Sequence, residues 1–152
     1  MTRAARRRAS AGFTLIEAVV ALMVVSIIVA IAIPSFQGLR RSAQDRAAQG
    51  EIGRVLAAER AFRQQEGAYT AEAATLSALA PEAVVHDSDP TAGVTLGVNE
   101  ATGAVCLERS SASGTTFGLW ESALEGAFYG QGGGLTGACP EAPPAGYTTG
   151  GW

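Results

Sequence analysis

Residues 13–33 read FTLIEAVVALMVVSIIVAIAI, an uninterrupted apolar run apart from Thr14, Glu17 and Ser26. As an α-helix this run would be about 31 Å long, which is enough to cross the ~30 Å hydrocarbon core of a bilayer. A helix buried in a soluble domain usually keeps one polar face, whereas this run is apolar on all sides. The sequence therefore predicts a membrane-spanning helix over residues 13–34.

The charges of the chain are unevenly distributed. Four of the eleven basic residues lie in the first eight positions, namely Arg3, Arg6, Arg7 and Arg8. The positive-inside rule then places the N-terminus in the cytoplasm, although Arg40 and Arg41 on the far side weaken the bias. From residue 13 onward the chain holds seven arginines against fourteen acidic residues. A body this acidic does not predict nucleic-acid binding through a basic patch.

The junction between the basic leader and the apolar run is unusual. An ordinary secretory signal has its small-residue cleavage site after an apolar core of about 7–15 residues. Here the small residue Gly12 precedes the apolar run. Cleavage after Gly12 would remove residues 1–12 with their charges and leave the apolar helix on a mature chain that begins at Phe13.

Glu17 places a carboxylate inside the apolar run, where it costs about a few kcal/mol at the bilayer centre and less near an interface. Cleavage after Gly12 would make Glu17 the fifth residue and create an α-amino group one helical turn away, at Phe13. In a bundle of packed helices, Glu17 of one subunit could pair with the amino group of the next. The alternative is an interfacial glutamate that only reaches the lipid headgroups.

Pro34 lies at the outer end of the apolar run. A proline inside a helix removes one backbone hydrogen bond and clashes with the preceding turn. Pro34 therefore either ends the helix or kinks it. Because residues 35–66 continue a helical pattern, a kink or a joint that can melt is favoured.

The stretch Gly12-Phe13-Thr14-Leu15-Ile16-Glu17 resembles the processing motif of type IV prepilins, shared by type IV pilins and the pseudopilins of type II secretion and competence systems. The resemblance implies that a membrane prepilin peptidase cuts after Gly12 and methylates the amino group of Phe13. Glu17 then matches the family glutamate that supports recruitment into the fibre, and Pro34 matches the helix-breaking proline.

The resemblance implies that the protein is a structural subunit and not an enzyme, and that it binds no cofactor and no metal. Its partners would be the prepilin peptidase, an inner-membrane assembly platform and other pilins in a homo- or hetero-oligomeric filament. The chain would cross the inner membrane once before assembly, and then lie in an extracellular or periplasmic filament. Adhesion, motility and DNA uptake are the roles of such filaments.

Residues 35–66 predict an amphipathic helix that ends before Gly67. Arg41–Asp45 and Glu59–Arg63 have the i,i+4 spacing of helical ion pairs. The predicted face that packs on the head recurs every three or four positions: Phe36, Leu39, Ala43, Ala47, Gly50 or Glu51, Val55, Ala58 and Phe62.

Residues 67–152 predict a head that gives the chain an α+β fold. A short helix is expected at 70–80, stopped by Pro81, with Tyr69, Leu76 and Leu79 as core contacts. Short strands separated by turns predict a three- or four-stranded antiparallel sheet packed on the amphipathic helix. These strands are expected at 93–98, 104–109, 115–120 and 127–129.

The head offers one covalent link and no catalytic motif. Cys106 and Cys139 are the only cysteines, and in an exported domain they predict one disulfide that ties a Gly/Pro-rich C-terminal loop to a strand. His86 stands alone in a predicted loop. Glu121 and Glu125 are interpreted as surface carboxylates. After Glu125 there is no acidic cluster of the kind that would hold the calcium ion typical of major pseudopilins.

Two alternatives remain open besides a pilin or a pseudopilin. Ala30-Ile31-Ala32 resembles an ordinary signal-peptidase site, so cleavage near Ala32 would release a soluble acidic binding domain. The second alternative is an uncleaved single-pass membrane anchor with a sensor or adhesive head. Tyr147, Trp152 and the glycine-rich loops of the C-terminal region either contact neighbours or ligands or are disordered.

Overall fold

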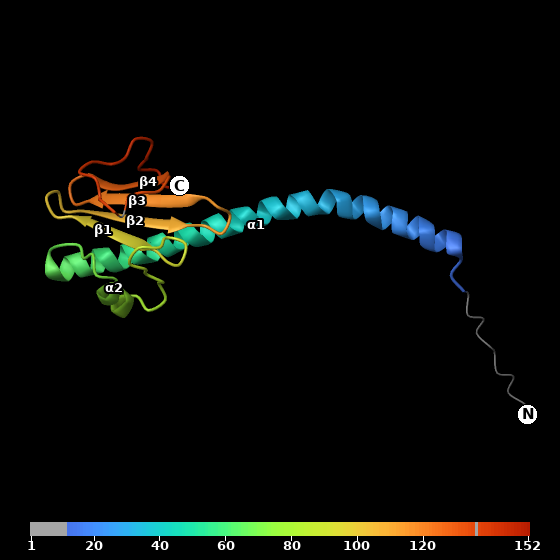
Figure 1. The fold of residues 1–152 in the computed structure, drawn as a ribbon, viewed down its shortest axis with the longest axis horizontal. Helices are drawn as coiled ribbons and strands as arrows, with labels where there is room; N and C mark the ends of the chain where they lie inside the picture. Colours follow the sequence, from blue (N-terminus) through green and yellow to red (C-terminus); the bar gives the residue numbers. More distant parts are fainter. Residues whose placement is uncertain (1–11, 136) are drawn as a thin grey trace, which may run out of the picture. The chain divides into compact units, whose positions relative to one another are not determined.

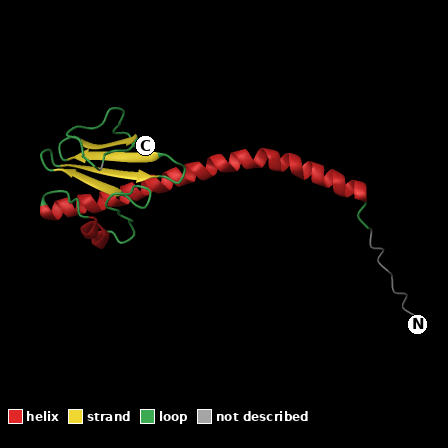
Figure 2. Ribbon diagram, viewed as in Figure 1, coloured by secondary structure: helices red, strands yellow, loops and turns green. Residues whose placement is uncertain are grey.

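The computed structural model describes residues 12–135 and 137–152, and the chain divides into two compact units, one up to Leu39 and one from Arg40 to Trp152. The predicted leader thus lies outside the described residues except for Gly12. Helix α1 (Leu15–Glu66) contributes to both units. The second unit, the head, adds helix α2 (Ala73–Leu79) and the strands β1 (Thr95–Asn99), β2 (Ala104–Ser110), β3 (Thr116–Ser122) and β4 (Gly126–Gln131) (Figures 1 and 2).

The four strands form one sheet in the order β1-β2-β3-β4, and each strand is antiparallel to the next. In the head, this sheet lies along one side of α1, while α2 lies on the other side of the helix (Figure 1). The predicted α+β fold, with a long N-terminal helix and an antiparallel meander, is confirmed. The last strand is longer than expected, because β4 pairs with β3 over its whole length, from Gly126 opposite Ser122 to Gln131 opposite Phe117.

The face of α1 that packs on the head differs from the predicted one. The buried residues of α1 are Ala48, Ile52, Val55, Leu56, Ala58 and Glu59. Of the predicted stripe in this unit, Val55 and Ala58 are buried, whereas Ala47 is exposed. Alanines occur on every side of this segment, so they do not fix the rotation of the helix. The two large apolar residues, Ile52 and Leu56, define the buried face instead.

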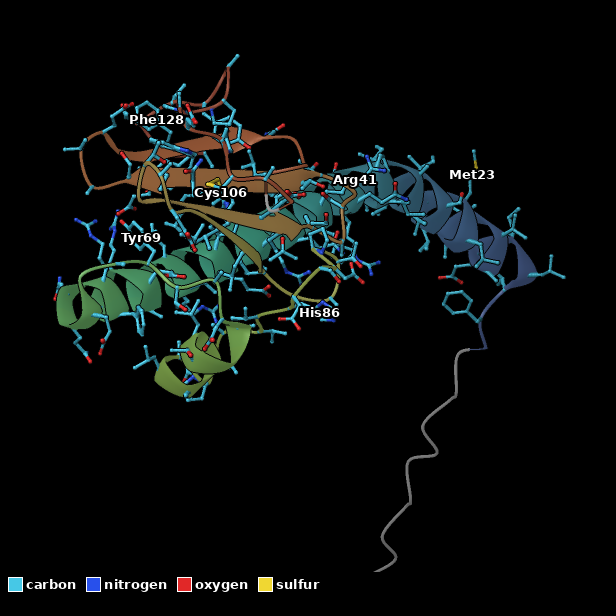
Figure 3. All side chains as sticks on the ribbon, turned by 60° about the vertical axis from the view of Figure 1, so that its left-hand side comes forward. Met23, Arg41, Tyr69, His86, Cys106 and Phe128 are labelled. Atoms are coloured by element: carbon cyan, nitrogen blue, oxygen red, sulfur yellow. A yellow bond between two sulfur atoms is a disulfide. The ribbon has the colours of Figure 1, made fainter. Side chains whose placement is uncertain are left out.

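The connection after α1 also contributes to the core. Gly67 has φ +86, and its N–H donates to the carbonyl of Arg63 at 2.8 Å, which ends the helix as a glycine at this position commonly does. Tyr69 and Leu76 are buried, as predicted, and Tyr69 lies between α1 and the sheet (Figure 3). The prediction for Leu79 was wrong, because its side chain is 46% exposed at the last residue of α2.

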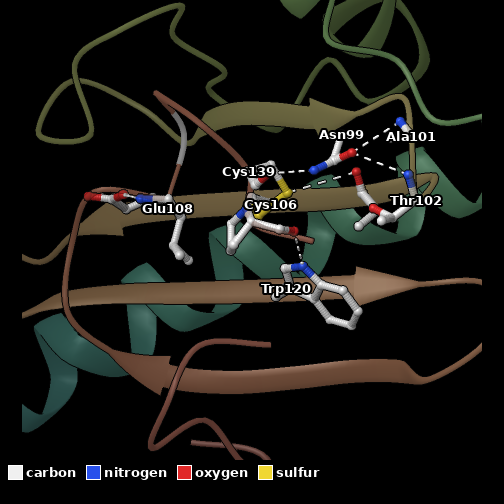
Figure 4. Close-up of a disulfide and its surroundings, with 10 residues drawn as sticks. Asn99, Ala101, Thr102, Cys106, Glu108, Trp120 and Cys139 are labelled. Carbon is white, nitrogen blue, oxygen red and sulfur yellow. Dashed lines mark hydrogen bonds between the residues drawn. A yellow bond between two sulfur atoms is a disulfide. The ribbon is translucent and has the colours of Figure 1, made fainter. Parts of the chain in front are cut away.

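A disulfide joins Cys106 in β2 to Cys139, with their Cα atoms 5.5 Å apart (Figure 4). It closes a loop with a sequence separation of 33 residues, which on the chain-entropy model stabilises the fold by about 4 kcal/mol. Two side chains of the sheet hold the same segment. The Trp120 indole N–H donates to the carbonyl of Pro140 at 2.9 Å, and the Asn99 amide donates to the carbonyl of Cys139 at 2.9 Å.

The C-terminal segment is ordered against β4 rather than disordered, which corrects one reading of the sequence. Tyr129 and Thr148 exchange two backbone hydrogen bonds of 2.8 and 2.9 Å. The ring of Trp152 packs edge-on against Tyr129 and Phe117, with ring centroids 5.3 and 5.2 Å apart. The ring of Tyr147 lies directly over two glycines of the sheet, Gly118 and Gly130, where any Cβ atom would clash with it.

Glu121 lies in β3 and is buried, so its interpretation as a surface carboxylate was wrong. The Arg60 guanidinium donates to both of its oxygens, with Nε–Oε1 at 2.9 Å and Nη2–Oε2 at 2.7 Å. The Tyr69 hydroxyl donates to Glu121 at 2.9 Å and accepts from Arg63 at 2.7 Å. The hydrogen bond with Glu121 raises the pKa of Arg60, and burial raises the pKa of Tyr69. This network fastens α1 and the chain after it to the sheet.

Glu59 is fully buried on α1, where the sequence predicted an ion pair with Arg63. Its Oε2 accepts a hydrogen bond from the backbone N–H of Thr70 at 3.1 Å, while Oε1 has no hydrogen-bond partner in the described part of the chain. Burial raises the pKa of this carboxyl to about 7. The neutral form is therefore favoured below about pH 7, because an uncompensated buried charge is expensive.

The raised pKa of Glu59 predicts that the free energy of unfolding falls as the pH rises from about 4.5 to about 7. In this window the folded state keeps a proton that the unfolded state has lost, so raising the pH favours unfolding, by up to ~3 kcal/mol. Glu59→Gln keeps an oxygen acceptor for Thr70 and should flatten this dependence. Urea unfolding of the full chain in detergent, followed by the fluorescence of the buried Trp120, measures the effect.

The matched control is Glu82→Gln, since Glu82 is exposed and lines a groove together with residues of α1 and the end of α2. This variant should keep the pH dependence of the parent. An unchanged pH dependence in Glu59→Gln would show that Glu59 does not carry the proton.

Candidate processing and assembly site

The peptide bond between Gly12 and Phe13 lies in exposed coil, because α1 begins only at Leu15. The Phe13 side chain is 72% exposed, and nothing lies within 4 Å of the position a Cβ atom of Gly12 would occupy. Proteases need an accessible chain that can be drawn out of secondary structure. The predicted scissile bond meets this requirement.

Thr14 and Glu17 together form the start of α1. The Thr14 hydroxyl oxygen accepts a hydrogen bond from the backbone N–H of Glu17 at 3.3 Å and donates to the Glu17 carboxylate at 3.4 Å. The first of these bonds is the threonine half of a Thr-x-x-Glu capping box, whereas the Glu17 carboxylate binds the Thr14 hydroxyl and not its backbone N–H. A carboxylate in the first turn also compensates the helix dipole. Glu17 therefore also stabilises the start of α1 through its hydrogen bonds with Thr14. This role was not predicted from the sequence, although the Thr14-x-x-Glu17 spacing indicates it.

The apolar part of α1 has no partner among the described residues. Its large side chains, from Leu15 at 83% to Val29 at 45%, are all substantially exposed. Ser26, the polar residue in its middle, donates its hydroxyl to the Met23 carbonyl at 2.7 Å, so this group is satisfied within the helix. By length and composition, α1 is the helix of the described chain that could cross a membrane.

Pro34 lies inside α1, and the helix continues beyond it. The helix therefore does not end at Pro34, which was one of the two predictions for this residue. Since proline has no N–H, the carbonyl of Ala30 loses its helical donor. The Ser35 hydroxyl, one residue later, donates to the carbonyl of Ile31 at 3.4 Å. A joint that melts here stays a prediction.

The remaining polar candidates form no reactive group. His86 lies on the exposed loop between α2 and β1 (Figure 3), and its Nδ1 accepts hydrogen bonds from the backbone N–H groups of Ser88 and Asp89 at 3.4 and 3.1 Å. A hydrogen bond from the Thr91 hydroxyl is the main cause that lowers the pKa of Asp89. These bonds shape the loop. Within residues 12–135 and 137–152, no three His, Cys, Asp or Glu side chains gather as metal ligands would.

Gly12, Phe13 and Glu17 thus lie together in the coil and first turn that open α1, whereas Cys106 and Cys139 lie in the head. The network of Arg60, Tyr69 and Glu121 was not predicted from the sequence. The sequence had predicted an ion pair for Glu59. This residue lies four positions after Val55, on the apolar face of the helix, and that spacing was the signal of its burial.

Comparison with known protein families agrees with the geometry of the N-terminal segment. Residues 7–33 match the model of the prokaryotic N-terminal methylation motif. The match spans Gly12, Phe13, Glu17 and the apolar run, and ends one residue before Pro34. No curated protein matches the chain. The chain therefore carries the N-terminal methylation motif that is the hallmark of type IV pilins and pseudopilins, joined to an α+β head of pilin-like architecture.

Proposed function

We propose that this protein is a major or minor pilin, a structural subunit of a type IV pilus-like filament. The observation that carries the proposal is the methylation motif at residues 7–33, which includes an apolar helical segment that has no partner among the described residues. Such a helix is stable in a bilayer or against other helices, but not in water. A filament whose centre is a bundle of these helices satisfies the same requirement after the chain leaves the membrane.

Processing is the first step of the proposed function. A prepilin peptidase cuts the exposed bond between Gly12 and Phe13 and methylates the new amino group. The helix that begins at Leu15 is already capped by Thr14. The cut therefore removes the leader without disturbing the helix, and the mature chain begins two residues before it.

Assembly is the second step, and it is driven by burial of the apolar half of α1. An inner-membrane platform would gather processed subunits and stack their helices. Small residues allow close approach of helix backbones in such contacts, and the apolar run contains Ala18, Ala21, Ala30 and Ala32. Glu17 of one subunit then pairs with the amino group of Phe13 of the next. Local capping by Thr14 holds the Glu17 carboxylate near the start of the helix before this contact forms.

A pseudopilin of a type II secretion or competence system is the closest alternative, since the same motif serves both classes. The release of a soluble domain by cleavage near Ala32 is less well supported. Residues 30–32 lie in the middle of α1, whereas Gly12 and Phe13 lie in coil. A helical bond must unwind before a peptidase can cut it.

Replacing Gly12 by valine should leave the leader attached. The residue before the cut must be small, and a branched side chain at this place would block the peptidase site. Peptide mass spectrometry of the N-terminus, on protein from the envelope of its native cells, measures the retained leader. Gly38→Val is the matched control, because Gly38 is also exposed with open space around it. A fully trimmed Gly12→Val chain would contradict cleavage at this bond.

Replacing Glu17 by alanine should leave trimming intact and reduce filament yield by about tenfold or more, the scale of a lost charge-assisted hydrogen bond. Sheared fibres are quantified against total processed subunit. Because the Glu17 carboxylate also accepts a hydrogen bond from the Thr14 hydroxyl that caps α1, the second variant is Glu17→Gln. The amide oxygen of glutamine can accept the same bond but carries no charge.

If Glu17 pairs with the amino group of Phe13, the glutamine variant should assemble as poorly as the alanine variant. Normal fibres from Glu17→Gln would show that the residue acts only through its hydrogen bond with Thr14 at the start of α1.

A further inference from the structure

The turn between β3 and β4 presents an unusual apolar side chain. Leu124 is 93% exposed, more than any other large hydrophobic residue in the described part of the chain. Tight turns favour Gly, Asn, Asp, Pro and Ser, and here Gly126, with φ +82, supplies the required backbone freedom. A leucine at the tip therefore contributes nothing to the turn itself. Its neighbour Glu125 is also exposed.

A groove of about 560 Å³ lies between α1 and the segment that begins at the end of α2. Its lining is mostly small and apolar, with one charged residue from each side: Arg54, Ala57, Ala58, Ala61, Leu79, Ala80, Pro81, Glu82 and Ala83. Leu79 is 46% exposed there, and the adjacent Val84 is 56% exposed. The groove has the size and chemistry to receive an aliphatic side chain.

The exposed turn and the groove are separate surfaces of one head. Ala123, at the base of the turn, lines a different cavity together with residues 67–71 and the β1–β2 turn. The high exposure of Leu124 shows that it does not fill the groove of its own chain. Any occupant of the groove that resembles this turn must come from another copy.

Glu125 lies next to Leu124, and the α1 side of the groove carries the cation Arg54, while Glu82 lies on the other side of the groove. Arg54 lies at the groove and donates only to the carbonyl of Gly50 in its own helix, at 3.4 Å. Neither Arg54 nor Glu125 forms an ion pair in the described residues, where the ion pairs are Arg60–Glu121 and Arg109–Glu51. A partner that places an aliphatic side chain in the groove and an acid on its α1 side, away from Glu82, would match the groove, and the sequence Leu124-Glu125 can do so.

We propose that Leu124 of one copy inserts into the groove of the next copy and that Glu125 pairs with Arg54 there. Because the two surfaces differ, each copy can use both at once, and such head-to-tail contacts extend into an open chain. The turn lies beside residues 67–71, just past the end of α1, while the groove spans residues 54–61. That difference of about 8–18 Å along the helix axis staggers successive heads.

This contact deepens the proposed function by naming how neighbouring heads meet in the filament, and it uses none of the residues that carry processing. The test is a pair of cysteines, Leu124→Cys with Leu79→Cys, in the full-length chain. Both native cysteines are already joined in a disulfide, so they do not compete. Both substituted positions are exposed, so the fold should tolerate the changes.

Mild oxidation of the intact envelope and its fibres should give a ladder of disulfide-linked dimers, trimers and longer species on a non-reducing gel. The matched control combines Leu79→Cys with Ala112→Cys, an exposed residue of the β2–β3 turn at the opposite end of the sheet, and should give no ladder. Dimers alone would indicate a symmetric contact and overturn the proposal. So would the absence of links, or an equal ladder in the control.

Charge exchange tests the second half of the contact. In the cysteine pair, Arg54→Glu or Glu125→Arg should each lower the ladder yield by about two- to fivefold, the range for exposed ion pairs, and the two together should restore it. The absence of restoration would overturn the Glu125–Arg54 pairing. Intact fibres without a ladder would contradict this contact but not the pilin proposal. A ladder from chains that keep their leader would support the contact and contradict the proposed processing.

Discussion

The apolar surface of the first half of α1 is the constraint on which the rest of the protein depends. Side chains from Leu15 to Ile33 are exposed on every side of the helix, and the described chain offers nothing to cover them. At about 25 cal/mol per Å² of apolar area, a surface of this kind cannot remain in water. The segment therefore needs a cover of lipid or of other apolar helices. In the proposed function, lipid covers it before assembly and other copies of the same helix cover it afterwards.

The head has a different requirement, because it must stay folded outside the membrane while attached to this helix. Ile52, Val55 and Leu56 supply the apolar contact of α1 with the sheet. Glu121, with both oxygens bonded to Arg60, joins the third strand to the same helix, and Tyr69 brings the following segment into the network. The disulfide and the ring of Tyr147 over Gly118 and Gly130 then fix the Gly/Pro-rich C-terminal segment on the sheet.

The sequence predicted the features that depend on local pattern. The apolar run, the end of α1 at Gly67, the meander of strands and the pairing of the only two cysteines all follow from spacing and residue type. The predictions failed where tertiary packing decides. The rotation of α1 could not be inferred among its many alanines, and Leu79 was exposed because α2 ends there. Burial of Glu59 and Glu121 depends on partners far away in the sequence, and the docking of Trp152 on Phe117 and Tyr129 depends on the path of the C-terminal segment.

The most direct test of the central claim is the mass of the N-terminal peptide of the protein taken from its native envelope. Cleavage after Gly12 followed by N-methylation predicts a peptide that begins at Phe13 and is heavier by one methyl group. A chain that begins near Ile33 would instead be a released soluble domain. A chain that keeps Met1 and its arginine-rich leader would be a plain membrane anchor. Either result would contradict assembly through a processed helix.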